Sequence, residues 1–241
     1  MSARLRRLLL AACVAMACPA SLGAATTRAV TLRAADGGTM AGTIWEPAQR
    51  PAAAVLLLPM QTRTRDDWQP LGARLADAGF IVLAIDLRGL AGTPGGGGLD
   101  ARIDPAPLLA DVTAALDFLT SRPDVRPGGI AIAGASMGAN LAVLAAAGDS
   151  RVRSLALLSP GLDYRGLRIE AAMRKCADRP ALLVASAKDA YVLRSVRELA
   201  RDAPGLREQR VVEAAAHGTT LLAREPDLAA TIADWFKRTL P

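Results

Sequence analysis

The sequence predicts an α/β protein: a three-layer, doubly wound and mainly parallel sheet with helices on both faces, preceded by an antiparallel hairpin. Three observations predict this fold class. Short, continuous apolar runs recur along the chain, amphipathic stretches separate them, and the two kinds of segment alternate almost to the C-terminus. Apolar runs without polar alternation are typical of strands that are buried on both faces, as strands are in parallel sheets.

The first two strands differ from the others and are expected to form the hairpin. Residues 29–32 and 39–45 flank the turn sequence Asp36-Gly37-Gly38, which favours a tight antiparallel connection. The remaining strands are expected at residues 53–58, 80–85, 130–133, 155–158, 182–185 and 208–212. The helices are expected at residues 68–78, 107–120, 137–147, 191–203 and 228–240.

Residues 1–25 are expected to be a signal peptide, and residues 26–241 a single domain. Three arginines precede an uncharged apolar stretch that ends in small residues, which is the order found in secretory signals. The apolar stretch is too short to remain as a membrane span. The alternative is a lipoprotein signal that ends at Cys18 and attaches the protein to the outer membrane. Both interpretations predict an exported protein, and the signal peptide, which we favour, predicts a periplasmic or secreted one.

The composition argues against several other classes of protein. The formal net charge is +6, but the arginines are scattered singly and aromatic residues make up only 3% of the chain. A nucleic-acid surface would combine clustered basic residues with aromatic platforms. Only Cys176 lies outside the signal region, so no internal disulfide is expected, and His217 is the one histidine. We therefore expect no metal, no cofactor and no nucleic-acid partner.

One serine stands at the joint between a predicted strand and a predicted helix. The sequence GASMG at residues 134–138 follows an apolar run directly and leads into a second one. In this position the pattern G-x-S-x-G is the nucleophile elbow, a strained turn that projects the serine hydroxyl above the sheet and needs glycine two residues to either side. The pattern predicts Ser136 as a nucleophile and the backbone N–H of Met137 as an oxyanion donor.

A serine nucleophile needs a base, and the chain offers one histidine. His217 follows the last predicted strand, so it is expected at the carboxyl edge of the sheet, where Ser136 also lies. The acid of such a triad follows a strand between these two residues in the chain. Asp189 and Asp163 both meet this condition. We favour Asp189 as the acid, and Asp163 remains the alternative.

With Ser136, Asp189 and His217 in this order, the chain resembles the α/β-hydrolase superfamily over nearly all of residues 26–241. The sequence DLRG at residues 86–89 is similar to the Asp-x-x-Gly turn that follows the fourth strand of these enzymes. The resemblance is strongest to the small, lidless branch that includes dienelactone hydrolases and bacterial serine esterases. It implies the α/β-hydrolase fold and a Ser-His-Asp triad that acts through an acyl-enzyme.

The resemblance also implies a second oxyanion donor after the third strand, where the sequence departs from the family pattern. Family members often carry His-Gly at this point, whereas this chain carries Pro59 and Met60. A backbone amide can donate whatever its side chain, so the N–H of Gln61 or of Met60 is the expected donor.

Two segments bear on access to the site. Residues 160–180 are too few for a helical cap domain, so an open, shallow site suited to short or protruding acyl groups is expected. The glycine-rich residues 92–98 are expected to be a surface loop, with a rim of the site as the alternative. These features together predict an exported serine hydrolase that cleaves a small-molecule carboxylic ester. The alternatives are a peptidase or amidase with the same triad and a non-catalytic binding protein with the same fold.

Overall fold

The computed structural model describes residues 24–89, 102–201 and 203–241. Residues 1–23 of the expected signal peptide, which include Cys18, and the glycine-rich residues 92–98 lie outside this part of the chain. Among the helices of the described ranges, none combines the length and the apolar character that a bilayer crossing requires.

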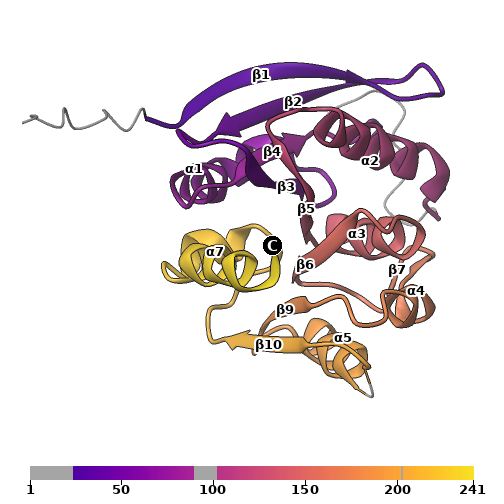
Figure 1. Cartoon of the computed structure of the whole chain (residues 1–241). Coiled ribbons are helices and arrows are strands. Elements are labelled where there is room, and N and C mark those ends of the chain that lie inside the picture. Colours follow the sequence, from indigo (N-terminus) through magenta and orange to yellow (C-terminus); the bar gives the residue numbers. More distant parts are fainter. Residues whose placement is uncertain (1–23, 90–101, 202) are drawn as a thin grey trace, which may run out of the picture.

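A single eight-stranded sheet forms the middle layer of the molecule (Figure 1). Its strands are β1 (Thr26–Arg33), β2 (Thr39–Glu46), β3 (Ala52–Leu58), β4 (Ile81–Ile85), β5 (Val125–Ala135), β6 (Val152–Leu158), β9 (Ala181–Ser186) and β10 (Arg207–Val212). Their order across the sheet is β1-β2-β4-β3-β5-β6-β9-β10. β2 pairs antiparallel with both β1 and β4, and every other pair in this sheet is parallel.

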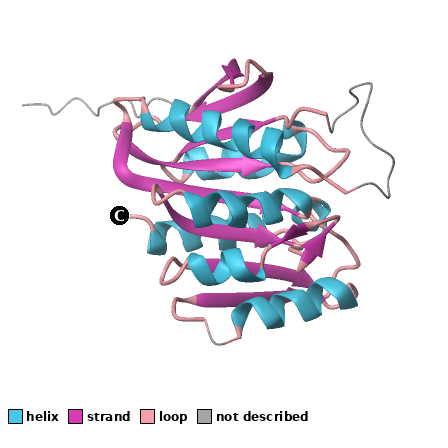
Figure 2. Ribbon diagram, turned by 90° about the vertical axis from the view of Figure 1, so that its right-hand side faces the viewer, coloured by secondary structure: helices cyan, strands magenta, loops and turns pink. Residues whose placement is uncertain are grey.

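Helices cover both faces of the sheet. One face carries α1 (Gln69–Asp77) and α7 (Leu228–Thr239), and the other carries α2 (Pro105–Thr120), α3 (Met137–Gly148) and α5 (Ala190–Ala200). Figure 2 shows the second group in front of the strands, which run across the picture. The described residues also form three short helices: η1 (Arg65–Trp68), α4 (Glu170–Lys175) and α6 (Thr220–Arg224).

Each face of the sheet has its own apolar core, and β3 shows why the strand sequences are continuously apolar. All seven of its residues are buried. Val55 and Leu57 belong to the core beneath α1 and α7, whereas Leu56 and Leu58 belong to the core beneath α2 and α3. Because successive side chains point to opposite faces, a strand that is covered on both sides must be apolar at every position.

The predicted fold class is confirmed, including the N-terminal antiparallel hairpin. The smallest elements were not predicted: these are the helices η1, α4 and α6 and the antiparallel pair of β7 (Asp163–Tyr164) with β8 (Leu167–Arg168), which precedes α4. Strands of two residues leave no apolar run or alternation in a sequence, so nothing marks them in advance. Residues 160–180 hold only β7, β8 and α4, and this described segment contains no cap domain.

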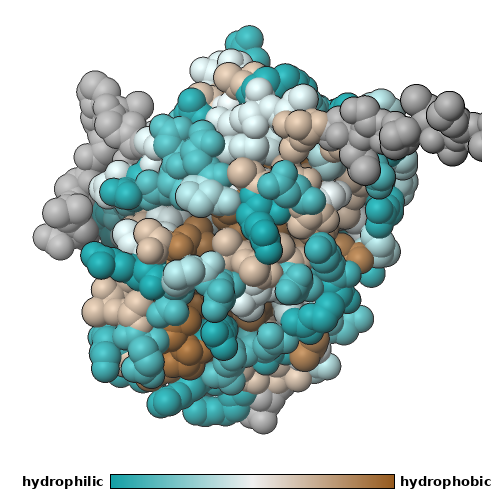
Figure 3. Space-filling model, turned by 90° about the vertical axis from the view of Figure 1, so that its left-hand side faces the viewer, coloured by the Kyte–Doolittle hydropathy of each residue, from teal (hydrophilic) through white to brown (hydrophobic). Residues whose placement is uncertain are grey.

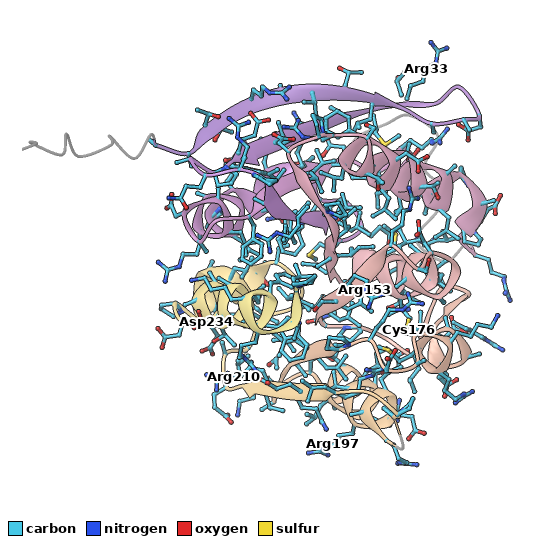
Figure 4. The ribbon with its side chains drawn as sticks, viewed as in Figure 1. Arg33, Arg153, Cys176, Arg197, Arg210 and Asp234 are labelled. Atoms are coloured by element: carbon cyan, nitrogen blue, oxygen red, sulfur yellow. The ribbon has the colours of Figure 1, made fainter. Side chains whose placement is uncertain are left out.

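The face that carries α1 and α7 is mainly hydrophilic (Figure 3), and Cys176, the one cysteine among the described residues, is buried and forms no disulfide. Both features are consistent with a fold that is stabilised by its apolar cores. Figure 3 shows the face that carries α1 and α7, where hydrophilic residues predominate and hydrophobic areas are scattered between them. Cys176 is fully buried beside the carbonyl group of Val143 on α3 (Figure 4). Burial raises the pKa of its thiol, which keeps the group neutral.

Candidate active site

Ser136 occupies the turn between β5 and α3. Its backbone has a φ of 50° and a ψ of −115°, a left-handed conformation that only a few per cent of non-glycine residues adopt. Its N–H donates to the carbonyl of Leu158 at 2.8 Å, which fixes the turn to the neighbouring strand β6. The side chain is buried, with 6% of the residue exposed. Strain held by the surrounding structure is typical of a functional position.

The two glycines of the elbow are required by close contacts between backbone segments. A Cβ atom at Gly134 would lie 2.3 Å from the carbonyl oxygen of Gly138. A Cβ atom at Gly138 would lie 2.4 Å from the carbonyl oxygen of Leu58 and 2.5 Å from that of Pro59. Neither contact can be relieved by a side-chain rotation, because both partners are backbone atoms. The elbow therefore brings the first turn of α3 against the end of β3.

Three side chains from separate strand ends meet at this turn. Ser136 Oγ lies 2.9 Å from Nε2 of His217, and Nδ1 of His217 lies 2.8 Å from Oδ2 of Asp189. With a proton on Nδ1, the imidazole donates to the carboxylate and accepts from the serine hydroxyl, which is the tautomer a general base needs. The other carboxylate oxygen of Asp189 accepts from the N–H of Val192 at 3.1 Å, which orients the group at the start of α5.

Asp163, the alternative acid, lies elsewhere and has other partners. Its carboxylate accepts from the N–H of Gly166 and from Nε of Arg168, each at 2.7 Å. The hydrogen bond from Arg168 lowers the pKa of Asp163, so the group is held as an anion on the β7–β8 hairpin. The structure thus brings Asp189, and not Asp163, to the histidine.

The loop that carries His217 is fixed by its neighbours in the chain and by β6. Thr220 Oγ1 accepts from the backbone N–H of His217 at 3.0 Å and donates to its carbonyl at 2.6 Å. The next residue, Gly218, donates its N–H to Ser159 Oγ at 2.9 Å. Ser159 stands at the carboxyl end of β6 with a φ of 55°. In the sequence, the one signal that Ser159 could help to hold this loop is its position directly after a predicted strand.

A second connection joins residues 213–219, which we call the histidine loop, to the segment after β3. We call residues 59–64 the oxyanion loop. Oγ1 of Thr219, next to His217, donates to Oδ2 of Asp67 at 2.7 Å and lies 3.4 Å from Sδ of Met60. A Cβ atom at Gly218 would also lie 2.7 Å from that sulfur atom. Met60 therefore packs against the histidine loop, and no sequence pattern pointed to Thr219 or Asp67.

The expected oxyanion donors lie around the same turn. Met137 is the first residue of α3, and its N–H is one of the amides that a helix leaves without an internal partner at its N-terminus. Gln61 lies in the oxyanion loop, and its Oε1 accepts a hydrogen bond from the hydroxyl of Tyr164 on β7. The first turn of α3 contains no acidic residue, so its dipole is available to a developing negative charge. The use of Met137, Gln61 or Met60 as a donor stays a prediction.

Asp86, at the start of the predicted Asp-x-x-Gly turn, anchors the far end of the oxyanion loop. Its carboxylate accepts from the backbone N–H of Arg65 at 2.7 Å and forms an ion pair with the guanidinium of the same residue. Gly89 closes the turn with a φ of 71°. Within the described residues no group of histidine, cysteine and acidic side chains could hold a metal ion.

One protein-family model and several solved structures match the chain. The family model, described as serine aminopeptidase S33, matches residues 49–224. A comparison with curated proteins gave no match.

Three solved structures illustrate the structural likeness. A dienelactone hydrolase from Anabaena variabilis has a TM-score of 0.74 and 20% identity, with 91% of this chain and 100% of that chain covered. An esterase from Pyrococcus furiosus has a TM-score of 0.72 and 16% identity, with 90% and 92% covered. DcsB, solved with a substrate analogue, has a TM-score of 0.77 and 14% identity, with 89% and 99% covered. At these identities the likeness shows the fold.

Proposed function

The chain belongs to the serine aminopeptidase S33 family of the α/β-hydrolase superfamily, and from this premise we propose that it is a serine hydrolase that cleaves small carboxylic esters. In this proposal Ser136 is the nucleophile, His217 the general base and Asp189 the acid that orients the base. The observation that carries the proposal is the pair of hydrogen bonds made by the two ring nitrogens of His217, at 2.9 Å and 2.8 Å.

The reaction proceeds in two halves. Ser136 Oγ attacks the ester carbonyl while its proton passes to Nε2 of His217, and the carbonyl oxygen becomes an oxyanion. The N–H groups of Met137 and of Gln61 or Met60 stabilise that charge. When the intermediate collapses, the bond to the alcohol oxygen breaks, His217 returns the proton to that oxygen, and the acyl group stays on Ser136. A water molecule then attacks the acyl carbonyl with His217 as base, which releases the acid and restores the serine.

A fluorophosphonate probe tests the assignment of the nucleophile. Such probes react with a serine only where a base and an oxyanion site activate it. We expect the wild-type protein to be labelled at Ser136 and the variant Ser136→Ala to remain unlabelled, with unchanged circular dichroism. A folded wild-type protein that takes no label would favour the alternative of a non-catalytic binding protein.

The type of bond that is cleaved needs a separate comparison, because the family description names an aminopeptidase. We propose ester rather than amide cleavage and a preference for short acyl groups, since residues 160–180 contribute no cap domain over the site. The test compares p-nitrophenyl esters of increasing acyl length with aminoacyl p-nitroanilides. We expect the highest kcat/KM with the short esters. A higher kcat/KM with the anilides would identify a peptidase or amidase.

Export rests on the sequence of the N-terminal residues alone. We propose that residues 1–25 are removed as a signal peptide and that the mature domain is periplasmic or secreted. Mass determination of the mature N-terminus in fractionated cells tests this, and a lipid-modified Cys18 would instead identify an outer-membrane lipoprotein.

A further inference from the structure

Residues 159–169, which we call the excursion, leave the sheet after β6 and carry the β7–β8 hairpin. Asn140, a fully buried residue on α3, holds this segment by its backbone. Its Nδ2 donates to the carbonyls of Gly161 and Leu167, each at 2.8 Å, and its Oδ1 accepts from the N–H of Gly161 at 3.1 Å. Buried hydrogen bonds of this kind are costly to break, so the base of the excursion is rigid.

Helix α5 holds the excursion from a second side. Ser195 Oγ lies within hydrogen-bonding distance of the N–H of Leu162, at 3.3 Å. The hydroxyl of Tyr191 accepts from the N–H of Asp163 at 3.1 Å and donates to its carbonyl at 2.9 Å. The backbone directly before Tyr164 is therefore fixed by side chains of α3 and α5.

From this fixed backbone, the half-buried side chain of Tyr164 reaches the oxyanion loop. Its hydroxyl donates a hydrogen bond to Oε1 of Gln61, a residue 103 positions away in the chain. The oxyanion loop contacts both the turn that carries Ser136 and the loop that carries His217. Pro59 approaches the elbow at Gly138, and Met60 contacts Thr219 beside the histidine.

We propose that Tyr164 is a positioning residue, which acts through the side chain of Gln61 to fix the backbone N–H of Gln61 toward the oxyanion. The inference rests on the proposed function. A donor stabilises a transition state best when its direction is set before the reaction, because no energy is then spent on reorienting it. The excursion supplies that constraint from outside the loop.

A double-mutant cycle tests the connection. Tyr164→Phe removes only the hydroxyl, and Gln61→Leu removes the acceptor while the backbone N–H stays. We expect each variant to lower kcat for p-nitrophenyl butyrate about fivefold with little change in KM, because one neutral hydrogen bond is lost. The double variant should be no slower than the slower single variant, since both changes remove one interaction. An unchanged kcat in Tyr164→Phe, or losses that multiply in the double variant, would overturn the inference.

Two control variants separate positioning from general damage. Gln209→Leu makes the same chemical change at an exposed position on β10 and should keep the wild-type kcat. Tyr191→Phe loosens the backbone that carries Tyr164, so its effect should pass through the same hydrogen bond: kcat should fall less than in Tyr164→Phe, and Tyr191→Phe should cause no further loss in the Gln61→Leu background. If Tyr191→Phe lowers kcat by the same factor with and without Gln61→Leu, the excursion does not act through Gln61 and the inference is wrong.

Hydrogen exchange gives a readout that does not depend on catalysis. The backbone amides of residues 60–64 should exchange faster in Tyr164→Phe and in Gln61→Leu than in the wild type, and Gln209→Leu should show no change. If Ser136 takes the fluorophosphonate label and esters are cleaved but Tyr164→Phe matches the wild type, the inference fails and the proposed function stands. If the wild type cleaves no ester, the proposed function fails, and unchanged exchange would show that Tyr164 does not fix the loop either.

Discussion

The carboxylate of Asp189 has two partners, and each of its oxygens has a separate task. One oxygen accepts from Nδ1 of His217 and the other from the N–H of Val192. The helix start therefore fixes the rotation of the carboxylate, and the carboxylate fixes the tautomer of the histidine. This arrangement depends on the charge of residue 189 and on its ability to accept hydrogen bonds. A substitution that removes the charge but keeps the shape therefore tests it directly.

We predict that Asp189→Asn lowers kcat for p-nitrophenyl butyrate by roughly 10³- to 10⁴-fold. The amide group can hold the histidine in place, but it favours the wrong tautomer and cannot stabilise the imidazolium. Steady-state kinetics on the folded variant measure the effect.

Asp163→Asn is the matched control for that substitution. Asp163 pairs with the exposed Arg168 on the β7–β8 hairpin, so its loss should change kcat by less than about fivefold. The reverse ranking of the two variants would show that Asp163 is the acid.

The roles of individual residues could be predicted where a local sequence pattern marks them. They could not be predicted where the role depends on a partner from another segment of the chain. Ser136 lies in a recognisable pattern, and His217 is the only histidine. Asn140 is an ordinary residue of an apolar helix until the fold brings the excursion against it. Tyr164 and Thr219 likewise acquire their partners from segments more than a hundred residues away, a distance that no local pattern encodes.

At the scale of elements, the start of α3 shows how backbone contacts dictate sequence. The helix begins at Met137, directly after the strained Ser136, and its first turn lies against the backbone at the end of β3. Glycine at position 138 permits that contact. The same helix ends at Gly148, where an added Cβ atom would meet nothing within 4 Å.

We predict that Gly138→Ala lowers the free energy of unfolding by about 3 kcal/mol and abolishes detectable ester cleavage, because the new methyl group must displace the backbone of residues 58–59. Urea unfolding and the kinetic assay measure the two effects. Gly148→Ala is the control on the same helix. It should leave activity unchanged and stability equal or higher by up to about 1 kcal/mol. Equal behaviour of the two variants would contradict the role assigned to the close contact.

The long strands and helices were predictable because an apolar run or an amphipathic pattern marks them in the sequence. The shortest elements carry no such pattern. β3 is apolar throughout and β9 is apolar up to its last residue, Ser186, as is typical of strands that are covered on both faces. β7 and β8 have two residues each, and their pairing depends on the hold of α3 and α5 on the excursion. Contacts of this kind join side chains and backbone groups from separate elements of the fold, and a linear sequence pattern does not contain them.

For the whole molecule, the scattered arginines have a structural use. Asp36, Asp124 and Asp149 each have a lowered pKa, caused first by a hydrogen bond from an arginine side chain. At Glu46, burial acts to raise the pKa, but the hydrogen bonds from Arg28 and Arg122 outweigh it and the pKa is again lowered. Several arginines are thus engaged in ion pairs, and those of Arg28, Arg88 and Arg122 join separate segments of the fold.

We predict that acid destabilises the fold through these carboxylates. Their pKa values are lower in the folded state than the ordinary values of 3.8 for Asp and 4.5 for Glu. Between the folded and the ordinary pKa, the unfolded chain binds more protons, so the free energy of unfolding falls as the pH falls. The stabilisation should be complete above about pH 5 and should be lost progressively below about pH 4.5. Urea unfolding at a series of pH values tests this.

The ion pairs of Arg151 with Asp149 and Asp117 supply one contribution to this acid dependence. Arg151→Met should lower the free energy of unfolding at pH 7 by about 1 kcal/mol, and the difference from the wild type should vanish below the lowered pKa of Asp149. Arg210→Met is the control, because Arg210 has no ion-pair partner among the described residues and is exposed on β10 (Figure 4). A difference for Arg151→Met that persists unchanged at low pH would exclude the ion pair as its cause.

In the proposed mechanism, Ser136 carries the acyl group between the two halves of the reaction. Intact-mass and peptide mass spectrometry of the enzyme, quenched with acid within the first turnover of p-nitrophenyl acetate, tests it directly. We expect an acetyl group on the peptide that contains Ser136, formed in the wild type and absent from both Ser136→Ala and His217→Ala. Ester cleavage at the wild-type rate without any acylated peptide, or with the acetyl group on another residue, would contradict it.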